Sequence, residues 1–361
     1  NGPIAIAVVP FARLRDNLFR QGAPLSGNRK QGLGMKRREL LALLGGVAVM
    51  ASSSARAQQP ARQRRIGILE TVSPKLNTEN LDALRRGLRE HGYVENQNYV
   101  LEYRSADGDG RRFPALADEL VRLGVDLIVT RGTPAARAAK NATETIPIVM
   151  AAIGEPLGMG VVATLARPGG NVTGLSAFVT ELAGKRVELL KELQPGNSSA
   201  AFFHNMGNPV VPQQWEETKK AAQTLGIEVF LLDVRTQDDI PRAFETASAR
   251  HVDTLLVGID ALIQEHRQLI TDLAAKHRLA AIYPSREFTD VGGLMAYGVS
   301  YPDLYFRSAT FIDKIFRGAK AGDLPVEQPT KLELIINLKA AKALDLSVPP
   351  TLLARADEVI E

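Results

Sequence analysis

Small polar residues stand at the ends of several short apolar runs in this sequence, where they are placed to bind a small molecule. Gly132 and Thr133 follow the run DLIVT, Glu155 lies in a Gly-Glu-Pro triplet, Asn205 follows AAFFH, and Asp260 follows TLLVGI. Each has a purely structural interpretation as well, because Thr, Asn and Asp cap helices and a loop carboxylate is usually solvated. Their recurrence at equivalent positions favours the functional interpretation, which is a shared ligand cleft.

The segment around Thr133 offers a specific chemistry, the binding of an anion. The sequence predicts that Thr133 caps a helix and that Pro134 occupies the first helical position. The free backbone amides of such a turn point outwards and attract negative charge. We therefore expect an anion site at this turn.

The elements that hold these residues alternate between strand and helix. Strands are predicted at residues 65–70, 99–103, 126–130, 147–151, 172–176, 200–204, 229–234, 254–259 and 279–283. Helices are predicted between them, including one at 157–165. Such alternation is typical of parallel sheets covered on both faces, and their ligands bind beyond the carboxyl ends of the strands. Two successive series of this kind predict an α/β protein with two doubly wound lobes.

The composition and the missing motifs exclude several classes of site. The 361 residues include no cysteine, which rules out disulfides, thiol nucleophiles and thiolate-bound metals. The sequence has no G-x-G-x-x-G after its first strand, no P-loop, no G-x-S-x-G and no H-E-x-x-H. The five histidines are interpreted as surface or cap residues. We therefore expect no catalytic residue, no cofactor and no metal.

The formal net charge of +4 is unevenly distributed along the chain. Residues 1–57 hold nine Lys and Arg against two acids, which leaves 35 basic and 38 acidic side chains for the rest. A mildly acidic body offers no electrostatic footprint for a phosphate backbone. We therefore expect no nucleic-acid partner.

The basic N-terminal part has the features of an export signal. A charged segment begins at Met35, an apolar run of 11 residues covers 40–50, and Ala-Arg-Ala at 55–57 is typical of a cleavage site. The apolar run is too short to span a bilayer. Residues 35–57 are predicted as a signal peptide and residues 1–34 as an upstream extension. We expect a periplasmic protein, exported by the Sec or the twin-arginine route, and not lipid-anchored because no cysteine follows the apolar run.

Several segments carry a resemblance to a known family. They are GEPLG at 154–158, LARPGGNVTGL at 165–175, REF at 286–288 and GGLMAYG at 292–298. Together they resemble the substrate-binding proteins of ABC importers in the TrpX-like family. The resemblance covers essentially the whole chain after the predicted signal peptide, and the ARPGGNVTGL run is quite specific.

The resemblance implies a type I periplasmic-binding-protein fold, in which two Rossmann-like doubly wound lobes are joined by three crossovers. The crossovers are expected near residues 177–180, 285–289 and 324–330. Lobe 1 is then expected to comprise residues 64–178 and 288–325, and lobe 2 residues 179–287 and 326–361.

The resemblance also implies roles for single residues near the strand ends. Ser73 and Thr133 stand where the family grips the ligand carboxylate from lobe 1, and Glu155 stands where relatives usually have Asp. Asn205 and Asp260 match polar positions of lobe 2. By this resemblance Asp260 accepts the α-ammonium group of a ligand.

Further candidates lie at a third strand end. Ser285 and Arg286 occupy a segment that is often acidic in relatives, so the ligand chemistry can differ there. Tyr283 and Phe178 are candidates for stacking on a ligand ring.

The function implied by the resemblance is solute binding for an ABC importer. A small metabolite, an amino acid or a similar carboxylate, is expected between lobes that close about a hinge, and the closed monomer is expected to dock on a membrane permease. Two alternatives stay open at this point. One is a ligand-sensing subunit of a membrane receptor, and the other is an enzyme that uses Glu155 or Asp260 as a base.

Overall fold

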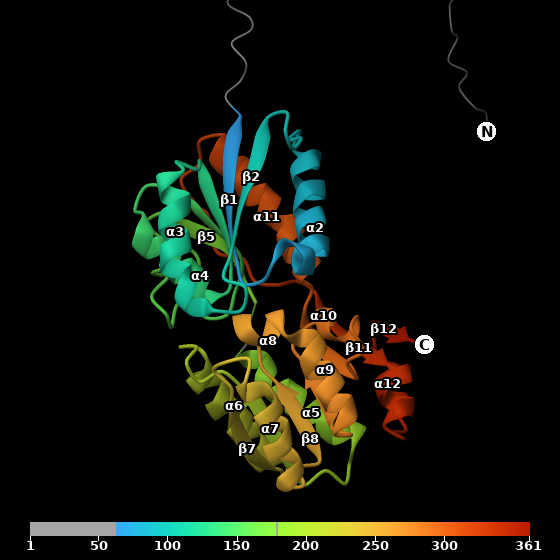
Figure 1. Ribbon diagram of the computed structural model, residues 1–361. Coiled ribbons are helices and arrows are strands. Elements are labelled where there is room, and N and C mark those ends of the chain that lie inside the picture. The colour runs from blue at the N-terminus through green and yellow to red at the C-terminus, as the bar shows by residue number, and fades with distance from the viewer. Residues whose placement is uncertain (1–62, 178–179) are drawn as a thin grey trace, which may run out of the picture. The chain divides into compact units, whose positions relative to one another are not determined.

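The computed structural model describes residues 63–177 and 180–361 of the chain (Figure 1). The predicted upstream extension and signal peptide lie outside these residues, and so does Phe178. Within the described residues no helix is long and apolar enough to cross a membrane.

The first sheet has five parallel strands in the order β2-β1-β3-β4-β5. Its strands are β1 (Arg64–Glu70), β2 (Tyr99–Ser105), β3 (Leu127–Arg131), β4 (Ile148–Ile153) and β5 (Val172–Ser176). Its helices are α2 (Thr78–Glu90), α3 (Phe113–Arg122), α4 (Thr133–Ala142) and α11 (Tyr301–Phe316). Two short 3-10 helices, η1 (Pro74–Asn77) and η2 (Gly110–Arg112), precede α2 and α3.

The second sheet has seven strands in the order β12-β11-β10-β9-β8-β6-β7. They are β6 (Ser199–His204), β7 (Glu228–Asp233), β8 (Thr254–Val257), β9 (Ala280–Tyr283), β10 (Met295–Val299), β11 (Leu332–Asn337) and β12 (Glu358–Ile360). Every pairing is parallel except that of β10 with β11. The remaining helices are α5 (Glu181–Leu193), α6 (Val211–Thr224), α7 (Asp239–Ala249), α8 (Ala261–Glu265), α9 (Arg267–Lys276), α10 (Arg286–Thr289), η3 (Ala321–Asp323), α12 (Leu338–Ala343) and α13 (Pro350–Leu353).

Each sheet is covered on both faces, as the apolar strands predict. In the first sheet Ile66 and Ile68 pack towards α2 and α11, whereas Ile128 and Met150 pack towards α3 and α4 (Figure 1). In the second sheet, adjacent residues of β6 likewise enter two different apolar clusters. The fold class is therefore confirmed: the chain is an α/β protein with two doubly wound lobes.

The predicted lobe boundaries need two corrections. Residues 288–325 were expected to lie together in lobe 1, but β10 pairs with β9 and β11 and so belongs to the second sheet. The chain therefore returns to the first sheet between β10 and α11, and not near residues 285–289. Val326, expected in lobe 2, packs in an apolar cluster of the first sheet. Hydrogen bonds between distant strands decide these memberships, and local periodicity does not reveal them.

The helix predicted at residues 157–165 is wrong. The structure has turns and bends there instead of a helix. The segment follows Pro156 and contains Gly158 and Gly160, and Gly160 has a φ of +64°. Glycines inside a short helix are costly, and this one adopts the left-handed conformation that few other residues tolerate.

Candidate functional site

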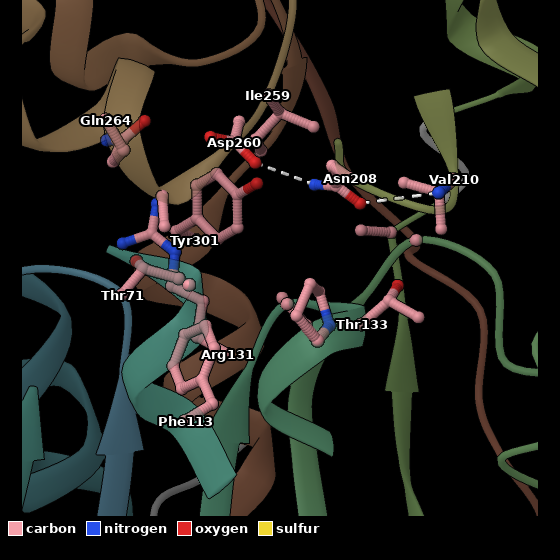
Figure 2. Close-up of a pocket in the computed structure, with 17 residues that line it drawn as sticks. Thr71, Phe113, Arg131, Thr133, Asn208, Val210, Ile259, Asp260, Gln264 and Tyr301 are labelled. Atoms are coloured by element: carbon pink, nitrogen blue, oxygen red, sulfur yellow. Dashed lines mark hydrogen bonds between the residues drawn. The ribbon is translucent and has the colours of Figure 1, made fainter. Parts of the chain in front are cut away.

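A pocket lies at the carboxyl ends of strands from both sheets (Figure 2). The residues that line it end or follow β1, β2, β3, β4 and β5 in the first sheet and β6, β8 and β10 in the second. Its enclosed cavity is about 70 Å³, and it adjoins a wider hollow of about 720 Å³ that Asp260 and Asn208 also line. The wider hollow falls within the roughly 300–1,000 Å³ that is typical of small-molecule sites. The position agrees with the strand-end rule for doubly wound sheets.

The start of α4 forms one wall of the pocket. The helix begins at Thr133, and the residue before it, Gly132, takes the N-cap position with a φ of +86°. The prediction that Thr133 is the cap is therefore wrong by one residue, because the glycine adopts the left-handed backbone that reverses the chain there. The amide of Gly132 donates to the carbonyl of Ala152 over 2.8 Å. The amides of Thr133 and Ala135 precede the first intrahelical bonds and remain available to an anion.

Asp260 forms the opposite side of the pocket and caps α8. Its Oδ1 accepts from the amide of Leu262 over 3.0 Å and from Nδ2 of Asn205 over 3.1 Å. Its Oδ2 accepts from Nδ2 of Asn208 over 2.9 Å. Burial raises the pKa of Asp260, although these donors act to lower it. All three donors are neutral, so no cation compensates the carboxylate.

Asn205 is itself held by a buried histidine. The amide of Asn205 donates to Nδ1 of His204 over 2.9 Å, and Nε2 of His204 lies 3.2 Å from Oε1 of Gln214. Burial lowers the pKa of His204 to about 3, so the ring is neutral at physiological pH. The ring packs on Gly258, where a Cβ would lie only 1.7 Å from Cδ2 of His204. The interpretation of His204 as a surface or cap residue is therefore wrong: it supports the second-lobe side of the pocket.

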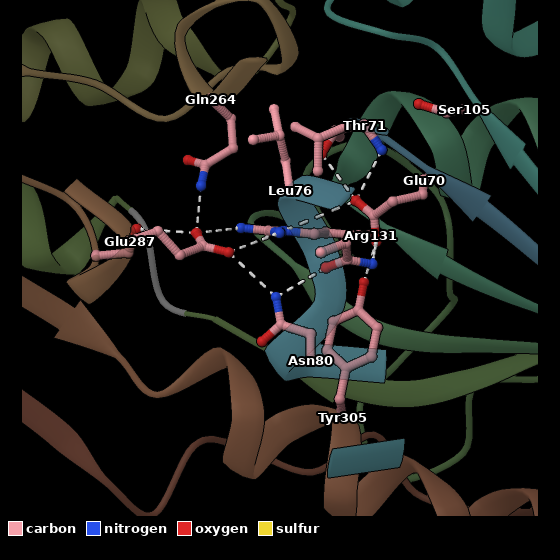
Figure 3. Close-up of polar contacts among 12 residues, drawn as sticks. Glu70, Thr71, Leu76, Asn80, Ser105, Arg131, Gln264, Glu287 and Tyr305 are labelled. Carbon is pink, nitrogen blue, oxygen red and sulfur yellow. Dashed lines mark hydrogen bonds and ion pairs between the residues drawn. The ribbon is translucent and has the colours of Figure 1, made fainter. Parts of the chain in front are cut away.

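Arg131, at the end of β3, lies between two carboxylates at one side of the pocket (Figure 3). Its guanidinium bonds both carboxylate oxygens of Glu287 over 3.1 and 2.7 Å, and its Nε lies 4.0 Å from Oε1 of Glu70. It also stacks on the ring of Tyr301, with 4.0 Å to the ring centroid. Burial acts to lower the pKa of Arg131, but Glu287 and Glu70 outweigh it and raise the pKa above its ordinary value. Its charge is therefore fully countered within the protein.

Glu287 connects elements of the two sheets. In addition to its bonds with Arg131, the Glu287 carboxylate accepts three hydrogen bonds. The donors are Nδ2 of Asn80 on α2 over 3.1 Å, Oγ of Ser285 over 3.2 Å and Nε2 of Gln264 on α8. Burial alone raises the pKa of a carboxyl group, but Arg131 outweighs it and holds the pKa of Glu287 below its ordinary value. We call Arg131, Glu70, Glu287, Asn80 and Tyr301 the Arg131 cluster.

Five of the predicted site residues lie in or beside the pocket. Gly132, Thr133 and Asp260 line the pocket, and Asn205 lines its wider outer part, which Asp260 also borders. Glu155 follows the lining residue Gly154 but does not line the pocket itself.

Two predicted serines lie outside the pocket lining, where they contact acidic residues. The amide of Ser73 lies 3.4 Å from Oε2 of Glu265, and Ser285 donates to Glu287 as described above.

The predicted ligand contacts of Tyr283 and Arg286 need correction. Tyr283 is 1% exposed and stacks on Phe288, with ring centroids 5.0 Å apart, because β9 is buried in the sheet. Arg286 is paired with Glu358 on β12 over 2.5 and 2.9 Å. Neither residue lines the pocket.

Sequence analysis missed several lining residues. Arg131 stands inside the TRGTP segment, and Asn208 lies in the same loop as Asn205, so their positions after strands were a usable signal. Phe113, Tyr301 and Gln264 start or lie within helices, where an aromatic or amide side chain is usually structural. Nothing in the local pattern distinguishes them.

Metal ligands are not assembled at this pocket or elsewhere in residues 63–177 and 180–361. No group of three His, Cys, Asp or Glu side chains is placed there to hold an ion. The arrangement therefore offers charge, hydrogen-bonding groups and apolar walls to a small organic ligand.

Comparison with known proteins agrees with a binding site of this kind. Residues 65–360 match the family described as ABC transporter substrate binding protein. The chain is 28% identical over 300 residues to the tyrosine-binding protein of Clostridioides difficile, covering 82% of this chain and 85% of that protein. It is 29% identical to an ABC domain from Streptococcus pneumoniae in complex with L-Trp, with a TM-score of 0.76 over 82% of this chain and 100% of that one. A conserved domain protein from Vibrio cholerae has 26% identity and a TM-score of 0.77, with the same coverage.

The fold and the pocket define a solute-binding protein with two doubly wound lobes. The chain belongs to the ABC transporter substrate-binding protein family. This confirms the family resemblance, and it places the chain among binding proteins and not among enzymes.

Proposed function

We propose that the chain binds an aromatic amino acid in this pocket and delivers it to the permease of an ABC importer. The observation that carries the proposal is Asp260, a half-buried carboxylate that only neutral donors hold, in a pocket with largely apolar walls. A free amino acid supplies a cation for such a group and a side chain for such walls. The relative named as a tyrosine-binding protein and the ABC domain solved in complex with L-Trp support the same ligand class.

The head group of the ligand is bound by opposite charges at the two sides of the pocket. Three hydrogen bonds from neutral groups reach the carboxylate of Asp260, and the amide of Ala261 also acts to lower its pKa. None of these donors carries a charge, so the ligand ammonium supplies the cation that the carboxylate lacks. The ligand carboxylate accepts from the amides of Thr133 and Ala135 at the start of α4, where the helix dipole favours negative charge. Arg131 is not its partner, because Glu70 and Glu287 already counter that charge.

The ring of the ligand packs among apolar and aromatic side chains. Phe113, Val210, Ile259 and Tyr301 line the pocket together. Aromatic pairs and apolar burial are the main sources of affinity for such a ring. The predicted ring partner Tyr283 is replaced in this role by Tyr301.

The physiological setting follows the sequence analysis. The protein acts as a monomer in the periplasm, after export by the Sec or the twin-arginine route and without a lipid anchor. Ligand shifts the lobes towards a closed form, and that form is recognised by the permease.

The proposal is tested by ligand screening of the purified protein. Mass spectrometry identifies molecules that copurify, and a thermal-shift screen compares L-tyrosine, L-tryptophan and L-phenylalanine with sugars and aliphatic amino acids. A ligand at a hundredfold excess over its Kd stabilises the fold by about 2.7 kcal/mol. Tyramine, which lacks the carboxylate, and 3-(4-hydroxyphenyl)propionate, which lacks the ammonium, are the matched controls and should stabilise less than tyrosine. Stabilisation by a sugar and by none of the aromatic amino acids would contradict the proposal.

A further inference from the structure

Gln264 has a hydrogen-bonding group that no residue in the described chain satisfies. It lies on α8, the helix that Asp260 caps, and both side chains line the pocket. It is 2% exposed and lines the pocket (Figure 2). Its amide nitrogen donates to Glu287, whereas its carbonyl oxygen Oε1 is buried with no donor among residues 63–177 and 180–361.

The orientation of this amide is fixed by chemistry. Glu287 is ionised, since Arg131 binds both of its oxygens, and an ionised carboxylate only accepts hydrogen bonds. The side of Gln264 that faces Glu287 must therefore be the NH₂ group (Figure 3). A flipped amide would place two acceptors against each other. The unsatisfied atom is thus an acceptor, and its partner must be a donor.

The position of Gln264 in the pocket indicates which donor is missing. Gln264 is tied through Glu287 to Arg131, whose guanidinium covers the ring of Tyr301. In Figure 2 it lies on the side of Arg131 and Tyr301, away from Thr133 at the start of α4. Asp260 and the start of α4 hold the ligand head group, so the aromatic side carries the ligand ring. Buried acceptors in native proteins are almost always paired.

We propose that Gln264 is a specificity-determining residue that accepts a hydrogen bond from a donor on the ligand ring. This inference rests on the proposed function. The donor is the phenol O–H of tyrosine or the indole N–H of tryptophan, and phenylalanine has neither. A site built to bond a ring donor discriminates strongly against an analogue without it, because the buried acceptor then stays unpaired.

The first test is calorimetric titration of the full chain with matched ligands. L-tyrosine or L-tryptophan should bind at least about tenfold more tightly than L-phenylalanine. O-methyl-L-tyrosine keeps the ring oxygen but has no donor, so it should lose the same advantage. Equal affinity for tyrosine, tryptophan and phenylalanine overturns the inference and leaves the proposed function standing. Failure of all aromatic amino acids to bind overturns both.

The second test uses two variants. Gln264→Leu should bring the affinity for the ring-donor ligand down to that for phenylalanine, while phenylalanine binding changes little and shows that the site is folded. Asp260→Asn, the control, leaves Glu287 and therefore the orientation of the Gln264 amide unchanged, and it should weaken tyrosine and phenylalanine by the same factor because both carry the ammonium. A Gln264→Leu variant that weakens both ligands equally assigns the side chain a structural role, or an ordered water as its partner, and overturns the inference.

Discussion

Arg131, which is buried, and Asp260, which is half-buried, are both charged groups of one pocket, but their surroundings differ. Arg131 lies between two carboxylates, with Glu287 bound through both oxygens and Glu70 at 4.0 Å. Asp260 is held by two asparagine amides and one backbone amide, all neutral. A charge that is countered within the protein serves the fold, whereas a charge that is only solvated by dipoles can still gain from an ionic ligand. The difference indicates a structural role for Arg131 and a ligand-binding role for Asp260.

The largest expected effect is on stability and comes from Arg131→Met. It leaves the carboxylates of Glu70 and Glu287 buried without their cation, and removing one partner of a buried pair costs about 3–5 kcal/mol. Urea unfolding measures this loss. The matched control is Arg286→Met, whose pair with Glu358 is about one third exposed and should contribute under ~1 kcal/mol. If both variants unfold at the same urea concentration, Arg131 has no structural role of the kind assigned here.

Asp260→Asn should reduce ligand affinity by about 2–4 kcal/mol, the scale for truncating one partner of a buried charge pair. The amide keeps the size of the side chain but removes the charge that the ligand ammonium requires. Calorimetric titration with L-tyrosine and with 3-(4-hydroxyphenyl)propionate separates the effects. The des-amino compound has no ammonium, so its weaker binding should change much less. Full retention of tyrosine affinity would show that the ammonium is bound elsewhere.

Glu287→Gln should have an intermediate effect. The variant weakens the ionic part of the contacts that Glu287 makes with Arg131 and Asn80, and we expect a larger open population. A reduced fraction of the binding-competent form lowers the apparent affinity by that fraction, here about tenfold. Small-angle X-ray scattering of the unliganded protein should show an increased radius of gyration. An unchanged radius of gyration together with an unchanged affinity would show that Glu287 takes no part in lobe closure.

The smallest expected effect is a pH dependence of binding that Asp260 causes. Burial raises its pKa, so the carboxylate takes up a proton at a higher pH than an exposed Asp does. Only the ionised form attracts the ligand ammonium, and affinity should therefore fall as the pH is lowered from about 7 towards about 4. His204, with a pKa of about 3, and Glu287, whose pKa is lowered, do not titrate in most of this interval. Titrations of Asp260→Asn should lack this slope, and a slope that persists in the variant would assign it to another group.

The sequence predicted the parts of the site that follow from strand ends. The β-α alternation located the strands after which Thr133 and Asp260 stand, and both line the pocket. It did not predict that Gly132 caps α4, because a one-residue shift changes no periodicity. It also assigned Tyr283 to a ligand ring, although the aromatic that lines the pocket is Tyr301, at the start of α11.

Taken alone, the sequence determined the fold class, the family resemblance and the polar groups at the strand ends, since each is written in neighbouring residues. Tertiary structure decided the sheet membership of β10 and the pairing of Arg131 with Glu287, which lie 156 positions apart. It also decided that His204 is buried and that the oxygen of Gln264 lacks a donor. The physical reason is that a buried charge or amide is defined by its partners, and these partners come from elements whose adjacency only the packed sheets and helices establish.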